Sequence, residues 1–168
     1  SLRNNIGIVP QKSILFNGTI KENLRYRQKD ATEEEMIQAP KTSQSYDFVM
    51  RNPKGLEAPV SQGGSNFSGG QKQRLAIARA VVGSPDIIIF DDSMSALDYA
   101  TDFELRKAIA NDCKGSTVII VSQRATSLKN ADLILVMENG CCTATGTHDT
   151  LLETSKTYRE IYNSQIEN

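Results

Sequence analysis

The second half of the chain contains two uninterrupted apolar runs, Ile87–Phe90 and Val118–Val121. Runs of this length without polar alternation are typical of strands that are covered by helices on both faces. Helical patterns precede the first run, over Gly69–Val82, and separate the two runs, over Thr101–Asn111. Because strand and helix alternate, the pattern predicts an α/β fold with parallel strands joined by right-handed crossovers.

The remaining predicted elements are shorter and more polar. A strand over Asn5–Val9 is expected to stop at Pro10, since the residue before a proline is restricted in conformation. Residues 20–67 have the pattern of a mostly helical insert, whose helices are expected to be divided at Pro40 and Pro53. The other expected elements are Thr19–Tyr26, Thr32–Gln38 and Ser45–Arg51 in the insert, then a short helix near Thr126, a hairpin of Leu133–Met137 and Cys141–Thr145, and terminal helices over Asp149–Thr154 and Thr157–Gln165.

Composition and charge exclude several classes of protein. The 168 residues include 19 Lys and Arg against 20 Asp and Glu, so no strongly basic surface is expected to attract nucleic acid. No apolar run approaches the roughly 18 residues that a membrane-spanning helix needs. Three cysteines without a C-x-x-C spacing indicate free thiols. The single histidine, His148, excludes metal sites built from several histidines.

A pair of glycines lies at the expected start of the long helix. Ser68 is a favourable N-cap, and with Gln71 three positions later it matches a capping box. A capping box alone does not require Gly69 and Gly70, each of which costs up to about 1 kcal/mol relative to alanine in a helix. Glycines are expected there if the backbone approaches a ligand closely, and a helix N-terminus favours anions. The residues alone leave two interpretations open, a helix cap and a phosphate site.

Two carboxylates follow the first apolar run, on Asp91 and Asp92. The carboxyl edge of a parallel sheet is where α/β proteins bind their ligands. Successive strand residues face opposite sides of a sheet, so the two side chains are expected to have different roles. Asp91 suits Mg²⁺ coordination through water, and Asp92 suits the orientation of an attacking water. The alternative is that these residues and Ser93 only cap a turn.

Four segments together resemble the motifs of ATP-binding cassette (ABC) proteins. Phe67–Gln71 resembles the LSGGQ signature motif, and Ile87–Asp91 resembles the Walker B strand. Ser95-Ala96-Leu97-Asp98 is similar to the D-loop of that family. Gln11 is similar to the Q-loop glutamine, and the run Ile14–Ile20 is similar to the segment that follows this glutamine in ABC exporters. The order and spacing of the four segments agree over nearly the whole chain.

The resemblance implies an ATPase domain that works as a head-to-tail dimer. Each ATP, with its Mg²⁺, would lie between the Walker motifs of one nucleotide-binding domain and the signature helix of the other. The residues that the resemblance assigns to these sites are Phe67, Ser68, Gly69, Gly70 and Gln71 toward the γ-phosphate of the partner's ATP, Gln11 and Asp91 toward Mg²⁺ or water, and Asp98 across the dimer interface. The other implied partner is the transmembrane domain of an exporter, which places this domain on the cytoplasmic side of a membrane.

Three features depart from the family pattern. The family carries a G-x-x-x-x-G-K-[ST] P-loop upstream of the Q-loop, and none occurs here. The chain is therefore expected to be a C-terminal fragment that binds ATP weakly, is inactive alone and has an exposed sheet edge. Asp92 replaces the usual catalytic Glu and is one methylene shorter, while Gln123 replaces the usual switch histidine and cannot become cationic. His148 lies elsewhere and is expected to be structural.

The sequence thus predicts an α/β fold: an incomplete P-loop NTPase (RecA-like) parallel sheet with helices and an inserted α-helical subdomain. Residues 1–19 would begin the core with the Q-loop, 20–67 would form the helical subdomain, and 68–168 would carry the signature helix, Walker B strand and D-loop. The expected function is ATP-driven export, with a weakened site of its own at Asp92 and Gln123 and a signature helix that completes the site of a heterodimer partner. Two alternatives stay open: a soluble ABC ATPase without a transporter, and a regulatory domain that binds nucleotide without hydrolysis.

Overall fold

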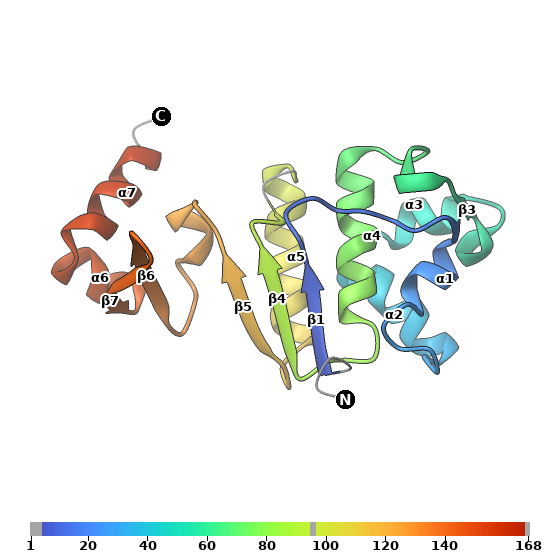
Figure 1. Ribbon diagram of the computed structural model, residues 1–168, viewed down its shortest axis with the longest axis horizontal. Helices are drawn as coiled ribbons and strands as arrows, with labels where there is room; N and C mark the ends of the chain where they lie inside the picture. The colour runs from blue at the N-terminus through green and yellow to red at the C-terminus, as the bar shows by residue number, and fades with distance from the viewer. Residues whose placement is uncertain (1–4, 95–96, 167–168) are drawn as a thin grey trace. The chain divides into compact units, whose positions relative to one another are not determined.

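The computed structural model describes residues 5–94 and 97–166 (Figure 1). The chain divides into two compact units, Ser1–Val121 and Ser122–Asn168. Each unit has its own hydrophobic core. The two units are therefore described separately.

The first unit is built on a parallel sheet of three strands in the order β1-β4-β5. The strands are β1 (Ile6–Val9), β4 (Ile87–Asp91) and β5 (Thr117–Val121), close to the bounds that the apolar runs predict. In the register of the sheet, Ile8 lies opposite Ile89, which lies opposite Ile119. The α/β prediction is confirmed, with parallel pairing on both sides of β4.

One face of this sheet is covered and the other is open among the described residues. Val9, Ile88 and Phe90 are fully buried in a core that includes residues of α4 (Gly69–Val81) and α5 (Tyr99–Asp112). On the other face, Ile8 and Ile119 are 56% and 44% exposed. The expectation of helices on both faces is therefore wrong for the part of the sheet that the structure describes.

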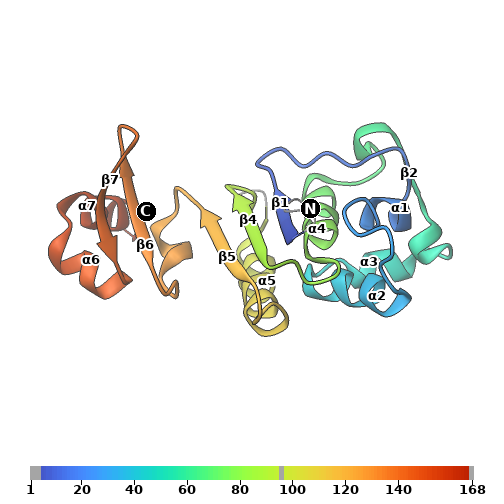
Figure 2. The same ribbon diagram turned by 60° about the horizontal axis from the view of Figure 1, so that its bottom comes forward.

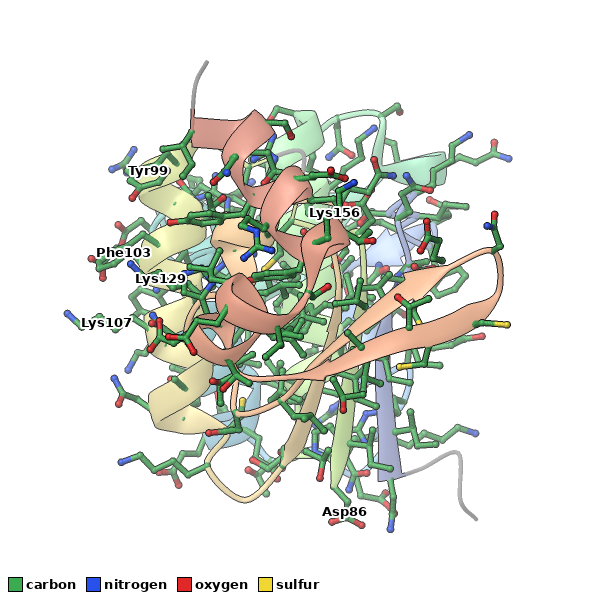
Figure 3. The ribbon with its side chains drawn as sticks, turned by 90° about the vertical axis from the view of Figure 1, so that its left-hand side faces the viewer. Asp86, Tyr99, Phe103, Lys107, Lys129 and Lys156 are labelled. Atoms are coloured by element: carbon green, nitrogen blue, oxygen red, sulfur yellow. The ribbon has the colours of Figure 1, made fainter. Side chains whose placement is uncertain are left out.

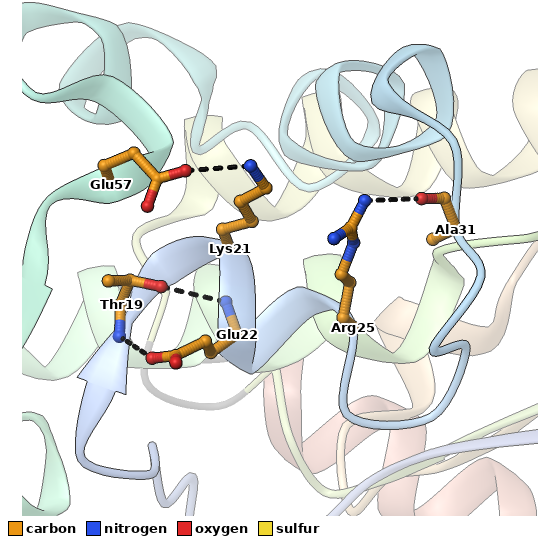
Figure 4. Close-up of polar contacts among 6 residues, drawn as sticks. All are labelled: Thr19, Lys21, Glu22, Arg25, Ala31 and Glu57. Carbon is orange, nitrogen blue, oxygen red and sulfur yellow. Dashed lines mark hydrogen bonds and ion pairs between the residues drawn. The ribbon is translucent and has the colours of Figure 1, made fainter.

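The helical insert is confirmed, and it lies beside α4 in both views (Figures 1 and 2). It contains α1 (Ile20–Leu24), α2 (Glu33–Thr42), α3 (Tyr46–Arg51), the short 3₁₀ turns η2 (Gly55–Glu57) and η3 (Gln62–Gly64), and the antiparallel pair β2 (Gly18–Thr19) and β3 (Pro59–Val60). Thr19 begins α1 with a capping box to Glu22, while Lys21 forms an ion pair with Glu57 at 2.9 Å (Figure 4). The expected division at Pro40 is wrong, because Pro40 lies inside the last turn of α2, where it removes only one helical donor.

The outer surface of α5 carries side chains at helical spacing. Tyr99, Phe103 and Lys107 project from it in a row (Figure 3). The two rings are 88% and 58% exposed. On the opposite side of the helix, Leu105 and Ile109 are buried in the core of the first unit. The α5 helix therefore buries one side in the core and exposes two aromatic side chains on the other side.

The second unit is a hairpin packed on two helices. After the 3₁₀ turn η4 (Ala125–Leu128), the strands β6 (Ile134–Glu138) and β7 (Cys141–Gly146) pair antiparallel, and α6 (His148–Thr154) and α7 (Lys156–Ile166) follow. His148 is buried, with Nδ1 2.9 Å from the Tyr158 hydroxyl oxygen, which fits the structural role expected of it. Among the helices of both units that the structure describes, none has the length and apolar character needed to cross a membrane.

Gly7 is required by the close approach of β1 to α4. A Cβ at this position would lie 2.2 Å from the Ala80 carbonyl oxygen and 3.2 Å from the Pro85 ring. We expect Gly7→Ala to lower the free energy of unfolding by about 1–3 kcal/mol, because the strand and helix must separate. Gly115→Ala is the matched control, since nothing lies within 4 Å of the Cβ built there. Urea unfolding followed by far-UV circular dichroism measures both, and equal losses for the two variants would contradict this packing argument.

Candidate functional site

Parallel pairing of β1 and β4 brings two of the predicted site residues together. Val9 lies opposite Phe90, so the chain leaves the sheet at the same edge two residues later, at Gln11 and Asp92. The Gln11 side chain donates from Nε2 to the Asp92 carboxylate at 3.3 Å. This edge is therefore the carboxyl end of the sheet, where ligands of α/β folds bind.

The two consecutive aspartates have different environments, as the sequence predicts. Asp91 is the last residue of β4, pairs with Val121 and is exposed. Asp92 is half-buried and adopts a left-handed backbone with φ of 44°, which Asp tolerates better than most residues. Its N–H donates to the Val121 carbonyl oxygen at 2.9 Å, which holds the turn against β5. The backbone therefore turns at Asp92, and the Asp92 carboxylate accepts from Gln11.

The donor set at this edge fits a divalent cation that also binds a phosphate ligand. Asp91 offers carboxylate oxygens and Gln11 offers an amide oxygen, both on exposed residues. Beside them the Ser93 hydroxyl is buried without a hydrogen-bond partner. Among the described residues, no three His, Cys, Asp or Glu side chains gather into a complete metal site. Mg²⁺ is usually held by one or two carboxylates together with substrate phosphates and water, and Asp91 and Gln11 offer oxygen donors of the kind it prefers.

The start of α4 matches the predicted capping box and leaves a free helix end. The Ser68 hydroxyl accepts from Gln71 N–H at 3.2 Å, and the Gln71 side-chain oxygen accepts from Ser68 N–H at 3.0 Å. Ser68 and Gly69 are exposed, and a Cβ at Gly69 would meet nothing within 4 Å. No packing contact among the described residues therefore explains this glycine. The exposed N–H groups of the first turn can bind an anion from another molecule.

Phe67 anchors this helix start to the helical insert. Its ring lies 6.3 Å from that of Phe48, and the Arg74 guanidinium lies 5.0 Å from the Phe48 ring centre. Arg74 also donates to the Gln44 carbonyl oxygen at 2.8 Å. Burial lowers the pKa of Arg74, and the Asp98 carboxylate partly opposes that shift. The Phe67 side chain is therefore held by its contact with Phe48, while Ser68 and Gly69 after it stay exposed.

Asp98 forms the N-cap of α5. Its carboxylate accepts from Thr101 N–H at 3.0 Å and from the Thr101 hydroxyl at 2.7 Å. These two bonds hold the pKa of Asp98 below its ordinary value. Ser95 and Ala96 of the predicted D-loop lie outside the described residues. The carboxylate at the end of that segment is thus exposed and held in one orientation by the helix that follows it.

Gln123 belongs to the second unit, in the loop that precedes η4. Its side chain is exposed. Its carbonyl oxygen accepts from Gln165 Nε2 of α7 at 2.8 Å. The predicted site residues therefore fall into three structural groups: Gln11 with Asp91 and Asp92 at the sheet edge, Phe67–Gln71 with Asp98 at two helix starts, and Gln123 in the second unit.

An aromatic pair on the helical insert was not indicated by the sequence. Phe16 and Tyr26 stack with ring centres 4.4 Å apart and remain 42% and 64% exposed. The Arg79 guanidinium lies 5.0 Å from the Phe16 ring centre, and its Nη1 is buried without a hydrogen-bond partner. Because the three residues come from separate elements, no local pattern identifies them. The pair is a rigid, exposed aromatic surface supported by a cation.

Comparisons with known proteins agree with this set of motifs. A profile of the family described as "ABC transporter" matches residues 1–95. The chain is 44% identical over 165 residues to the ABC transporter ATP-binding protein YknU of Bacillus subtilis and 41% identical over 165 residues to a putative multidrug export ATP-binding/permease protein of Staphylococcus aureus. It covers 28% of each relative, and 98% of the chain is matched in both. A bacterial Atm1-family ABC exporter solved with ATP bound superposes with a TM-score of 0.91 at 36% identity, over 98% of this chain and 29% of that one.

The Thr101 backbone N–H is the main cause of the lowered pKa of Asp98, and the Thr101 hydroxyl is expected to lower this pKa further. Thr101→Val removes one of the two donors, so the pKa should rise toward its ordinary value of about 4, while Thr101→Ser keeps the hydroxyl and should leave it low. Folding lowers the pKa of this carboxyl, so its contribution to stability is present at neutral pH and is lost as the pH falls through the lowered value. Carboxyl ¹³C NMR titration measures both variants. Equal pKa values in the two would show that the hydroxyl does not act on Asp98.

Proposed function

We propose, on the premise that this chain belongs to the ABC transporter family, that it acts as part of the ATPase of an exporter that couples ATP binding and hydrolysis to transport. The profile match to residues 1–95 and the relatives above 40% identity show the family. The observation that carries the proposal is the exposed, glycine-containing start of α4, which no contact within the described chain explains. An ATP phosphate held by a second nucleotide-binding domain is the ligand that fits it.

The α4 helix presents its N-terminus to that phosphate as a rigid unit. Backbone N–H groups at Gly69 and Gly70 lack helical acceptors, and the helix dipole favours a negative ligand there. The Ser68 hydroxyl is oriented by its capping bond with Gln71 and can also donate to a phosphate oxygen. Because the first turn carries no acidic side chain, nothing in it repels the anion. In a head-to-tail dimer this end of the domain completes the partner's ATP site, and Asp98 extends the same contact.

The sheet edge supplies the residues for the chain's own half-site. Asp91 would bind Mg²⁺ directly or through water, and Gln11 would add an amide oxygen. Bound Mg²⁺ neutralises charge on the phosphates during transfer. Asp92 accepts a hydrogen bond from Gln11, which orients its carboxylate toward the position of an attacking water. A glutamine that touches both the carboxylate and the ligand can report the state of this site to a membrane domain.

Two substitutions weaken this half-site. Asp92 is one methylene shorter than the Glu that the family usually has, and a displacement of about 1 Å in a catalytic group can cost on the order of 10²-fold in rate. Gln123 can donate to a phosphate oxygen but carries no positive charge. The signature helix carries no comparable change. We therefore place this chain as the subunit with the slower site in a heterodimeric exporter, completing a competent site on its partner.

The Phe16–Tyr26 pair is the proposed contact surface for the transmembrane domain. Its two stacked rings are exposed, and the Arg79 guanidinium packs beneath them and supports them as a rigid surface. The relative from Staphylococcus aureus is named as an ATP-binding/permease protein, and this chain covers 28% of its length. This surface favours an exporter on the cytoplasmic side of a membrane over a soluble ABC ATPase. A regulatory domain without hydrolysis is the second candidate, because Asp92 and Gln123 are both atypical.

Restoring the usual residues should accelerate hydrolysis at this chain's own site. With the partner's catalytic Glu disabled in the full-length heterodimer, Asp92→Glu together with Gln123→His is expected to raise ATP turnover by about tenfold or more. Asp86→Glu is the matched control, since it adds the same methylene just before β4, at the end of the strand opposite to Asp92 (Asp86 is labelled in Figure 3). Asp86 accepts there from Asn5 Nδ2.

Single-turnover hydrolysis measures the three proteins. The weakened-site proposal would be overturned if the heterodimer with only the partner's catalytic Glu disabled hydrolysed ATP as fast as the unaltered heterodimer. No acceleration by the double variant would instead favour the regulatory candidate.

Loss of the exposed aromatic ring should weaken contact with the membrane domain. Tyr26→Ala is expected to reduce the affinity between separately expressed membrane and ATP-binding domains by at least about tenfold, because buried tyrosines often dominate an interface. Phe103→Ala removes a similarly exposed ring from α5 and should leave the affinity unchanged. A pull-down titration compares the two. Equal affinities for both variants would show that the Phe16–Tyr26 surface does not bind the membrane domain.

A further inference from the structure

One side chain of the C-terminal helix holds the loop that carries Gln123. Gln165 donates from Nε2 to the Gln123 carbonyl oxygen at 2.8 Å, and its Oε1 accepts from Ala125 N–H at 2.9 Å. Both halves of a single amide are therefore paired with backbone groups two residues apart. A neighbouring β-strand would make the same pair of contacts, so the Gln165 amide substitutes for a strand at this point.

Few other contacts hold this loop within the second unit. Between Val121 and the start of η4 the chain has no regular secondary structure. Arg124 N–H donates to the Ser122 hydroxyl at 3.0 Å, and Ala125 is buried against Ile134 and Leu151 in the core of the unit. The Gln123 carbonyl oxygen has no other hydrogen bond that the structure describes. The backbone at Gln123 is therefore held by a local turn at Ser122 and, from 42 residues away, by Gln165.

The α7 helix is anchored independently of Gln165. The Tyr158 hydroxyl pairs with buried His148 at 2.9 Å, and the Tyr162 ring meets the His148 ring edge-on with centres 4.8 Å apart. These contacts lie one to two turns before Gln165 in the helix. Loss of the Gln165 amide should therefore free the loop without releasing α7 from the unit.

We infer that Gln165 is a positioning residue that sets the orientation of Gln123 for ATP hydrolysis. The inference rests on the proposed function, in which the side chain at position 123 meets a phosphate. Gln165 itself touches no ligand, and it acts by fixing the backbone from which the residue at position 123 extends. Any partner or modification that shifts the end of α7 would by the same contact change the hydrolysis rate at this site. The C-terminal helix would in that way regulate the loop.

A double-mutant cycle in the full-length heterodimer tests this inference. In a background that carries Asp92→Glu and Gln123→His, with the partner's catalytic Glu disabled, Gln165→Leu is expected to lower kcat about tenfold and to change KM little, because it removes both hydrogen bonds that hold the loop. In the same background with Gln123→Ala instead, no side chain remains to be positioned, so Gln165→Leu should have almost no effect. An equal decrease of kcat in both backgrounds would show that Gln165 has only a structural role and would overturn the inference.

A second readout does not depend on ATP hydrolysis. Gln165→Leu should increase hydrogen exchange at the Ala125 amide about tenfold in the same full-length protein, because the Gln165 oxygen is its acceptor. Gln165→Glu keeps an acceptor for Ala125 and loses the donor to Gln123, so it should preserve protection at Ala125 and still lower kcat. Asn163→Leu, at an exposed position of the same helix, is the control that should change neither.

The two readouts separate the possible failures. Unchanged hydrogen exchange at Ala125 in Gln165→Leu would show that the Gln165 side-chain amide does not hold the loop. That result would overturn the inference regardless of the measured kcat. Increased exchange with no coupling between positions 165 and 123 would overturn the positioning role. Failure of the proposed function would appear differently, as no hydrolysis in any background while the exchange result still holds.

Discussion

Parallel pairing between β1 and β4 joins residues that are 81 positions apart in the chain, Gln11 and Asp92. The pairing depends on Gly7, which lets β1 lie against the backbone of α4. Because α4 also carries the Phe67–Gln71 segment at its other end, the packing of one strand on one helix locates two of the site groups. The remaining group of the first unit, Asp98, is placed by the turn that leaves β4 and by its own cap on α5.

The two ends of α4 have opposite requirements. Toward its C-terminal end the helix buries its own Ile77 and Ala80 in the core, where Ala80 lies against Gly7 of β1, and this packing fixes its axis. At the N-terminal end it must stay uncovered if a ligand from another molecule is to reach the first-turn N–H groups. The capping box meets the second requirement, because Ser68 and Gln71 satisfy only each other's backbone donors and leave the first turn accessible. A rigid helix with one buried and one free end can thus transmit a phosphate contact to the core.

Local patterns predicted what depends on neighbouring residues, such as the start of α4 from Ser68 and Gln71 and the strand bounds from uninterrupted apolar runs. They failed where the outcome depends on distant groups. The burial of Ile8 and Ile119 depends on what covers the sheet, which an apolar run does not contain. Pro40 stays within α2 because the helix ends two residues later. Gln165 looks like any polar residue on a helix, and its contact is made 42 residues away.

Neutral amides orient functional groups at three places in this chain: Gln71 at the start of α4, Gln11 at Asp92 and Gln165 at the loop after β5. An amide offers a donor and an acceptor in a fixed plane and does not titrate near neutral pH, so these orientations do not change with pH. A histidine offers charge but changes its donors when it titrates. Placing Gln at position 123 and holding its backbone with a second Gln therefore favours constant geometry over cationic assistance. That balance would suit the slower site of the proposed heterodimer, which would hold ATP in one geometry and hydrolyse it slowly.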